Sequence, residues 1–158
     1  MDKIDIGFEA IKWHRKLQPS PVGHGDGNLQ ARALLERAST PTDAYLCHPM
    51  VIDLHNSLGG HRYDDCRVGA IAAVLAGVRI NDAMSVPKRL MYNKVNQHTV
   101  KQLMAASTDD DVLYQFRRLV RLMGNRANVA SIAEAMFDWT NIYRGDIRKR
   151  SWMYKFYS

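Results

Sequence analysis

Apolar side chains recur every three to four residues along most of this chain, and this spacing constrains its fold more than any other feature. The clearest segment begins at Thr108, a residue type that caps helix N-termini, and ends at Gly124. Its apolar stripe consists of Val112, Leu113, Phe116, Leu119, Val120 and Met123. Such a stripe covers one side of an amphipathic helix, which gains its stability by packing on other elements. We therefore predict a helix from Thr108 to Gly124 with one buried side.

Similar periodic segments cover the rest of the chain. Helices are expected at residues 2–17, at 28–38, from Thr40 to Leu58 with a break at Pro49, at 66–79, in short pieces from 85 and from 96, at 128–143, and from 146 onward. No run of alternating β-branched residues bounded by turns interrupts them. We therefore predict an all-α protein, a two-lobed helical bundle of about eight to nine helices. The lobes are expected at 1–84 and 85–158, within one compact unit.

Three segments of the first lobe carry specific expectations about burial. The first helix is expected to bury Ile4, Phe8, Ile11, Trp13 and Leu17. The second is expected to bury Leu29, Ala33, Leu34 and Ala38, with Arg32 and Arg37 turned outward. The segment at 66–79 is apolar on nearly every side, so it should be the most buried helix of this lobe.

Helix ends are also marked in the first lobe. Gln18 to Asn28 is expected to be a loop. Thr40 suits an N-cap with Pro41 at the first helical position. Asp64 and Asp65 are expected to cap the helix at 66–79.

Charge is distributed unevenly between the two halves. Residues 1–84 hold nine Lys or Arg and ten Asp or Glu, whereas residues 85–158 hold thirteen and six. The second half therefore carries a net charge of +7, against −1 for the first. Such asymmetry indicates an anionic partner, although a surface charge that only aids solubility is the alternative.

Arginines and aromatic residues occur together in the last third of the chain. Arg117, Arg118 and Arg121 share one side of the helix at 108–124, where like charges repel each other. The final segment holds Arg148, Lys149, Arg150, Trp152, Phe156 and Tyr157. Guanidinium groups bind phosphates and aromatic faces stack on unpaired bases. Alternatively, the arginines favour helix C-termini and the aromatic residues belong to the core.

Signals for catalysis or for a metal are weak. The segment Gly23 to Gly27 lacks the preceding strand and the Gly-Lys-Ser/Thr of a phosphate-binding loop, so we interpret it as a linker. Five residues could ligate zinc but lack the paired spacing of structural zinc sites: Cys47, His48, His55, His61 and Cys66. No nucleophile or metalloprotease motif is present. We expect two buried thiols, no enzymatic activity, no metal and no cofactor.

The sequence gives no sign of export or of a membrane span. The first residues lack the basic-then-apolar order of a secretion signal. The longest apolar run, residues 68–78, is far shorter than the roughly 20 residues that cross a bilayer. We expect a cytoplasmic protein with no membrane partner.

Seven segments match one family in order and spacing. They are Ala31 to Ala38, the Pro49-led Met50 to Leu54, the apolar helix Arg67 to Arg79, Ser85 to Leu90, Val100 to Leu103, Asp111 to Val120, and Ala133 to Trp139. The chain resembles the CasB family, the small subunit of the type I-E CRISPR surveillance complex called Cascade.

The resemblance implies a non-catalytic protein that holds opened target DNA inside a larger complex. Its implied partners are both strands of the DNA, guide RNA, the backbone and large subunits of Cascade, and a second copy of itself. Together with the charge pattern, it gives a nucleic-acid-binding set of Arg37, Arg117, Arg118, Arg121, Arg148, Lys149 and Arg150. Glu36 stands where the family often has arginine, which weakens the contact expected near Arg37.

Two other functions remain open on sequence alone. A helix-turn-helix within residues 85–124 would make the chain a sequence-specific DNA-binding regulator, although its exposed arginines suit phosphates better than base edges. A small metal-dependent hydrolase built on the His and Cys residues is the other alternative.

Overall fold

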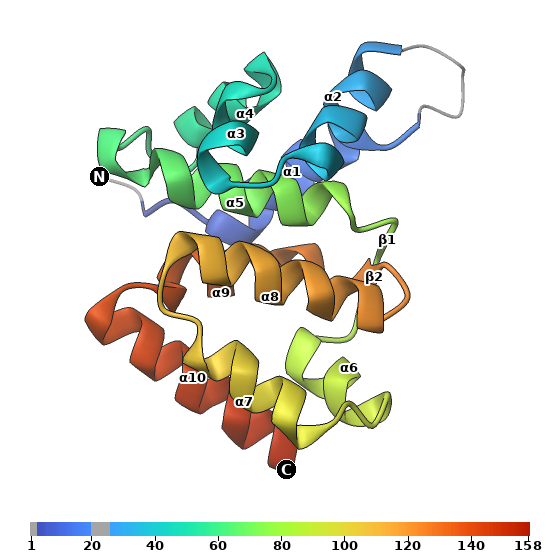
Figure 1. Cartoon of the computed structure of the whole chain (residues 1–158), viewed down its shortest axis with the longest axis vertical. Coiled ribbons are helices and arrows are strands. Elements are labelled where there is room, and N and C mark those ends of the chain that lie inside the picture. The colour runs from blue at the N-terminus through green and yellow to red at the C-terminus, as the bar shows by residue number, and fades with distance from the viewer. Residues whose placement is uncertain (1–2, 20–25) are drawn as a thin grey trace.

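The computed structural model describes residues 3–19 and 26–158, and helices dominate this part of the chain (Figure 1). The α-helices are α1 (Ile6–Leu17), α2 (Asp26–Arg37), α3 (Pro41–Leu46), α4 (Pro49–Ser57), α5 (Asp65–Ala76), α6 (Val86–Tyr92), α7 (Gln97–Ala105), α8 (Asp109–Leu122), α9 (Val129–Trp139) and α10 (Ile142–Tyr157). A 3-10 turn, η1 (Arg62–Asp64), precedes α5. The all-α class is confirmed, with ten α-helices in the described residues where eight to nine were predicted.

Figure 1 shows α1 to α5 in the upper part of the molecule, α8 and α9 across the middle, and α6, α7 and α10 below. Helix α5 contacts α2, α3 and α4 on one side and α8 and α9 on the other, and α1 packs on α9. Helices of both sequence halves therefore share one core. A lobe boundary between residues 84 and 85 stays a prediction.

Helix α5 is the buried centre of this core, as its sequence predicted. All nine residues from Val68 to Ala76 are buried. A side chain at Gly69 would collide with the carbonyl of Pro41, so the glycine lets α3 lie directly against α5. The predicted caps are wrong in part. The helix begins at Asp65, the Asp64 side chain makes no capping bond, and the Asp65 carboxylate accepts only from the nearby Cys66 amide at 2.8 Å.

Helix α1 buries a different side from the one predicted. Its buried residues are Gly7, Ala10, Trp13, His14 and Leu17. Phe8 is 57% exposed and Ile4 lies before the helix and is also exposed, so the predicted stripe through these two residues is wrong. The cause is close packing on α9: the small residues of α1 face that helix, and a Cβ at Gly7 would meet Ala130 and Glu134.

Helix α2 also differs from the prediction. It begins at Asp26, inside the expected loop, and it buries Ala31, Leu35 and Ala38. Leu29 is exposed, whereas Ala33 and Leu34 are only half-buried. Leu35, and not the neighbouring Leu34, enters the core. The buried side of α2 is therefore rotated relative to the predicted apolar stripe. The Gly23–Gly25 part of the predicted linker lies outside the described residues.

The predicted helix at 108–124 is confirmed as α8. The Thr108 hydroxyl accepts from the Asp111 amide at 3.1 Å, and Gly124 follows the helix with a φ of 70°. The predicted stripe from Val112 to Met123 is buried.

The segment 128–143, predicted as one helix, is divided between α9 and the start of α10. Helix α9 ends at Trp139, and the Asn141 side chain accepts from the amides of Tyr143 and Arg144 to start α10. Tyr143 is 80% exposed and does not extend the stripe. Gly145 lies against the carbonyl of Trp139, where a Cβ would not fit, and this close approach folds α10 back on α9.

Two very short strands tie the connection after α5 to the connection after α8. Strand β1 (Ile80–Asn81) pairs in parallel with β2 (Arg126–Ala127). Next to them Asp82 is buried and accepts from Arg89 Nε at 2.6 Å and Nη2 at 3.0 Å. The hydrogen bond from Arg89 is the main cause that lowers the pKa of Asp82.

In the described part of the chain, no helix combines the length and the hydropathy that a membrane span requires.

Candidate nucleic-acid interface

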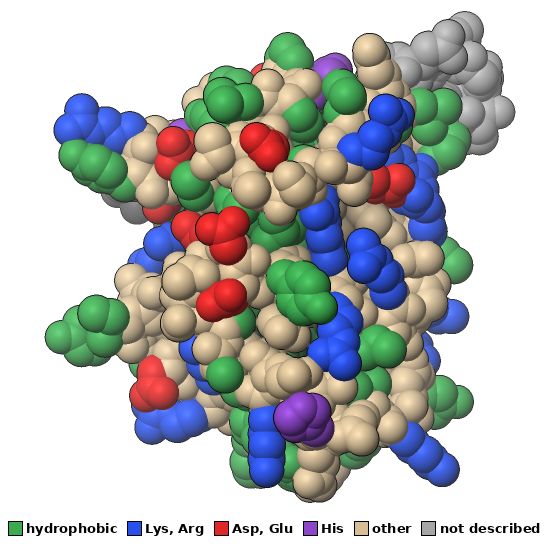
Figure 2. Space-filling model, viewed as in Figure 1, with side chains coloured by type: hydrophobic (Ala, Val, Ile, Leu, Met, Phe, Trp, Pro, Cys, Tyr) green, Lys and Arg blue, Asp and Glu red, His purple; other side chains and the backbone are tan. Residues whose placement is uncertain are grey.

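The second half of α8 carries the predicted arginine stripe. The first turn of this helix is acidic, with Asp109, Asp110 and Asp111, and the arginines follow toward its C-terminal end. This order complements the helix dipole, which favours acids at the N-terminus and bases at the C-terminus. Figure 2 shows Lys and Arg side chains gathered over the C-terminal half of α8 and toward the end of α2, with Asp and Glu over the opposite end of α8.

Arg117 is bound to the end of α2. Its Nη1 donates to the carbonyl of Ala38 at 2.5 Å and its Nη2 donates to the carbonyl of Leu35 at 2.7 Å. Both carbonyls lie at the C-terminal end of α2, where the Leu35 carbonyl also accepts from the Ala38 amide at 3.2 Å, so the guanidinium acts as a C-cap. Burial is the first cause that lowers the pKa of Arg117, and repulsion from Arg121 is the second.

Arg118 and Arg121 lie in different environments from that of Arg117. Arg118 Nη1 donates to Gln102 Oε1 of α7 at 2.6 Å, so its partner is also neutral. Arg121 is exposed one turn further along α8, and Arg37 is exposed at the end of α2. Among the residues that the structure describes, none of these four arginines forms an ion pair.

A hollow of about 290 Å³ lies where α2, α5 and α8 end. Its charged lining residues are Glu36, Arg79, Arg117 and Arg121. Arg79 was missed at the sequence level because it follows α5 as an isolated arginine and no local pattern separates it from a surface residue. The fold brings Arg79 to Arg117 and Arg121, and we define these three residues with Glu36 as the α8 hollow.

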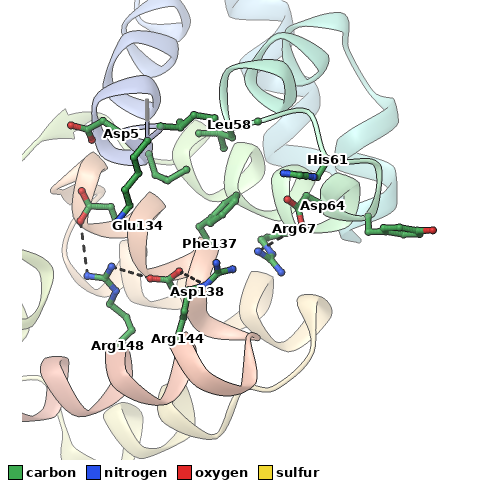
Figure 3. A pocket seen from close by; sticks show the side chains of 15 residues that line it. Asp5, Leu58, His61, Asp64, Arg67, Glu134, Phe137, Asp138, Arg144 and Arg148 are labelled. Carbon is green, nitrogen blue, oxygen red and sulfur yellow. Dashed lines mark hydrogen bonds and ion pairs between the residues drawn. The ribbon is translucent and has the colours of Figure 1, made fainter. Parts of the chain in front are cut away.

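Two basic residues of α10, Arg144 and Arg148, line a separate and larger groove of about 1080 Å³. Arg148 Nη2 contacts Asp138 at 3.0 Å, and its Nη1 lies 4.0 Å from Glu134 (Figure 3). Arg144 contacts the same Asp138 at 3.3 Å. The guanidinium groups of this groove therefore meet carboxylates.

Lys149 and Arg150 complete the predicted α10 set. Arg150 pairs with Asp146 at 3.2 Å on the helix surface. The Lys149 ammonium donates to the carbonyl of Ala106 at 3.4 Å and lies 5.4 Å from the centre of the Trp139 ring. Within the described chain, the seven predicted residues thus fall into a set near the end of α8 and a separate set on α10.

Two of the tail aromatics, Trp152 and Phe156, are structural. Trp152 is 3% exposed, and its ring centre lies 5.2 Å from that of Trp139 and 5.8 Å from that of Phe116. Phe156 is also buried. These two side chains belong to the core and cannot stack on bases, whereas Tyr157 is exposed.

Two of the potential zinc ligands, His55 and His48, have other roles. His55 is buried, donates from Nε2 to the carbonyl of His61 at 2.6 Å and accepts at Nδ1 from the Tyr45 hydroxyl at 2.8 Å. His48 caps α4 by accepting from the Met50 amide at 3.1 Å. Cys47 and Cys66 are half-buried rather than fully buried as expected. No group of three potential ligands converges among the described residues.

Comparison with known proteins decides the family. The family model described as CRISPR-associated protein Cse2 matches residues 31–157. The chain belongs to the Cse2 family. This is the CasB family of type I-E Cascade, so the resemblance seen in the sequence is confirmed. No curated protein and no solved structure matches the chain significantly.

The Cse2 match covers all seven predicted basic residues as well as Arg79 and Glu36. It also bears on the alternative of a helix-turn-helix regulator. Helix α8, the candidate recognition helix, contacts α3, α5, α7 and α9, and its Arg117 and Arg118 bind protein groups. Neither the family nor the packing of α8 favours that regulator.

Proposed function

We propose that this chain is the small subunit of a type I-E Cascade complex and that it binds nucleic-acid backbone without sequence preference. In this role it stabilises the R-loop, in which the guide RNA pairs with one DNA strand and the other strand is displaced. The observation that carries the proposal is the arginine set Arg117, Arg118 and Arg121 of a Cse2-family chain, in which Arg117 and Arg118 donate to neutral protein groups and Arg121 is exposed. Their positive charge remains available to phosphates.

The physical basis is that R-loop formation exchanges one duplex for another at little net cost in free energy. The RNA–DNA duplex that forms is about as stable as the DNA duplex that opens, so modest contacts to the separated strands shift the equilibrium. Arginines bind phosphates through charge-assisted hydrogen bonds and need no base contact. A non-catalytic subunit with a basic surface is therefore sufficient for this function.

We propose the same partners that the family resemblance implies: both strands of target DNA, guide RNA within the complex, the backbone and large subunits, and a second copy of the chain. The outward side of α10 supports contact with a neighbouring subunit because Tyr143, Ile147 and Tyr154 are all exposed along it. The proposal places the protein in the cytoplasm, without a catalytic role of its own.

A salt titration tests the proposal. The isolated chain should bind labelled single-stranded and duplex DNA of unrelated sequences weakly, with affinity falling steeply as salt rises. Within a purified complex, loss of the chain should lower the yield of R-loop on matched target DNA. Binding that is absent, or independent of salt, both alone and in the complex would contradict the proposal.

Co-expression tests membership of the complex. The chain should purify with guide RNA and the large helical-backbone subunits encoded beside it. A footprint of the isolated protein at one defined DNA site would instead support the regulator.

A further inference from the structure

Glu36 is the carboxylate of the α8 hollow and lies within a group of arginines. It stands in the last turn of α2, and its Oε1 accepts a hydrogen bond from Arg79 Nη2. Arg32 Nε, one turn earlier on the same helix, lies 3.8 Å from the same oxygen. A single carboxylate oxygen therefore faces two guanidinium groups.

The arginines around Glu36 outnumber it. Arg32, Arg79, Arg117 and Arg121 contribute four positive charges, and Glu36 contributes one negative charge. These arginines repel one another: after burial, Arg79 is the next cause that lowers the pKa of Arg32, and Arg121 is the next cause that lowers the pKa of Arg117. Glu36 acts in the opposite direction on both groups. An additional anion at this hollow would relieve the remaining repulsion.

Arg79 is fixed independently of Glu36. Its Nη1 donates to the carbonyl of Ala76 at the end of α5 at 2.7 Å, and its backbone amide donates to the carbonyl of Asn125 at 2.8 Å. If the Glu36 side chain turned away, Arg79 would keep its place beside the hollow and Nη2 would need a new acceptor. Glu36 is partly exposed at the surface and has room to turn toward solvent.

We propose that Glu36 competes with bound nucleic acid for Arg79. In the free protein the Glu36 carboxylate accepts a hydrogen bond from Arg79 Nη2. In the bound protein a backbone phosphate of the strand replaces this carboxylate, beside Arg117 and Arg121. The inference rests on the proposed function and adds two residues to the site, Arg79 as a phosphate ligand and Glu36 as an internal anion that lowers affinity. Such a contact keeps backbone binding weak and reversible.

Charge-neutral substitution tests this role in the full-length chain. Glu36→Gln is compared with Glu9→Gln, which removes the same charge from α1, where Glu9 pairs with Lys12 at 3.5 Å. The probe is fluorescein-labelled single-stranded DNA of mixed sequence, titrated at several salt concentrations. Glu36→Gln should bind about five-fold tighter than wild type, with a salt slope steeper by about 0.7, while Glu9→Gln should change affinity by less than about 1.5-fold. An equal effect of the two variants, or weaker binding by folded Glu36→Gln, would overturn the inference.

A double-mutant cycle separates competition from a general charge effect. Arg79→Gln should weaken binding about two-fold in the wild-type background and about ten-fold in the Glu36→Gln background, because only the second background leaves Arg79 without a carboxylate. Equal losses in both backgrounds would also overturn the inference.

Thermal melting followed by circular dichroism checks that the variants are folded. If Glu36→Gln is unfolded, Glu36→Asp replaces it: the shorter side chain keeps the charge but withdraws from Arg79, and binding should be about two-fold tighter. No gain with Glu36→Asp would count against the inference. If the wild-type protein itself showed no salt-dependent DNA binding, the result would contradict the proposed function and not only this inference.

Discussion

The arginines of α8 and those of α10 look equivalent in the sequence but differ in what they contact. Arg117 and Arg118 donate to backbone carbonyls and to an amide oxygen, which hold the guanidinium groups without forming an ion pair. Arg148 and Arg150 contact carboxylates, which neutralise their charge. A basic segment attracts phosphate by its net field, so the neutrally held arginines are expected to be the stronger nucleic-acid contacts.

The aromatic residues of α10 are divided between the core and the surface. On α10, Trp152 packs among core rings, whereas Tyr154 two positions later is 78% exposed. The basic-aromatic tail thus contributes mainly to stability through its buried side.

Removal of the buried tail aromatic should destabilise the fold. Trp152→Ala takes away a side chain packed on Trp139 and Phe116 and should lower the free energy of unfolding by about 4 kcal/mol. Chemical denaturation measures the change. The matched control Tyr154→Ala should cost less than about 0.5 kcal/mol. Similar losses for both variants would show that the tail is not divided into a core side and an outer side.

Charge reversal on α8 should abolish most DNA binding without unfolding the protein. The double variant Arg118→Glu, Arg121→Glu should weaken binding to single-stranded DNA by about 50-fold, because two phosphate attractions become repulsions on the exposed side of the helix. Fluorescence anisotropy at fixed, low salt measures the affinity. A folded variant that binds within about three-fold of wild type would place the DNA contact away from α8.

Arg117 should affect stability more than its neighbour on the same helix. Arg117→Met loses two charge-assisted bonds to the last carbonyls of α2 and should reduce the free energy of unfolding by about 1.5 kcal/mol. Arg118→Met loses one bond to a side-chain amide and should cost about 0.5 kcal/mol. Chemical denaturation of both variants makes the comparison, and a larger cost for Arg118→Met would contradict the C-cap role of Arg117.

The paired arginines of α10 should have the smallest effect on binding. Arg148→Gln with Arg150→Gln removes two cations that already face Asp138 and Asp146, so the affinity for single-stranded DNA should change by less than about two-fold. The same anisotropy assay applies. A loss above ten-fold would mean that bound DNA separates these ion pairs and uses the arginines.

Local signals were enough to predict α8 and α5. The Thr108 cap, the apolar stripe and Gly124 all lie within one segment, and the run from Val68 to Ala76 has no polar side to expose. The start of α10 also had a local signal, since Asn141 is a good N-cap residue. The apolar spacing from Ile132 to Trp139 simply continued to Tyr143 and hid this signal.

Other features depend on tertiary contacts and could not be predicted. Helix α1 packs on α9 through Gly7 and Ala10, and the size of Phe8 gave no hint that it would face outward. The site shows the same limit. Arg117 was identified from its place on α8, but its acceptors lie 79 and 82 positions earlier in the sequence. Likewise, Arg79 and Glu36 meet only because α2 and α5 end side by side in the fold.

The salt dependence of binding tests most directly whether the neutrally held arginines of α8, and not the carboxylate-paired arginines of α10, contact the nucleic acid. Two double variants are compared on the same single-stranded DNA: Arg118→Gln with Arg121→Gln on α8, and Arg148→Gln with Arg150→Gln on α10. We expect the α8 pair to reduce the slope of log affinity against log salt by about 1.4, the value for two lost phosphate contacts, and the α10 pair to leave the slope unchanged. Equal reductions, or a larger reduction for the α10 pair, would contradict the role proposed for the α8 arginines.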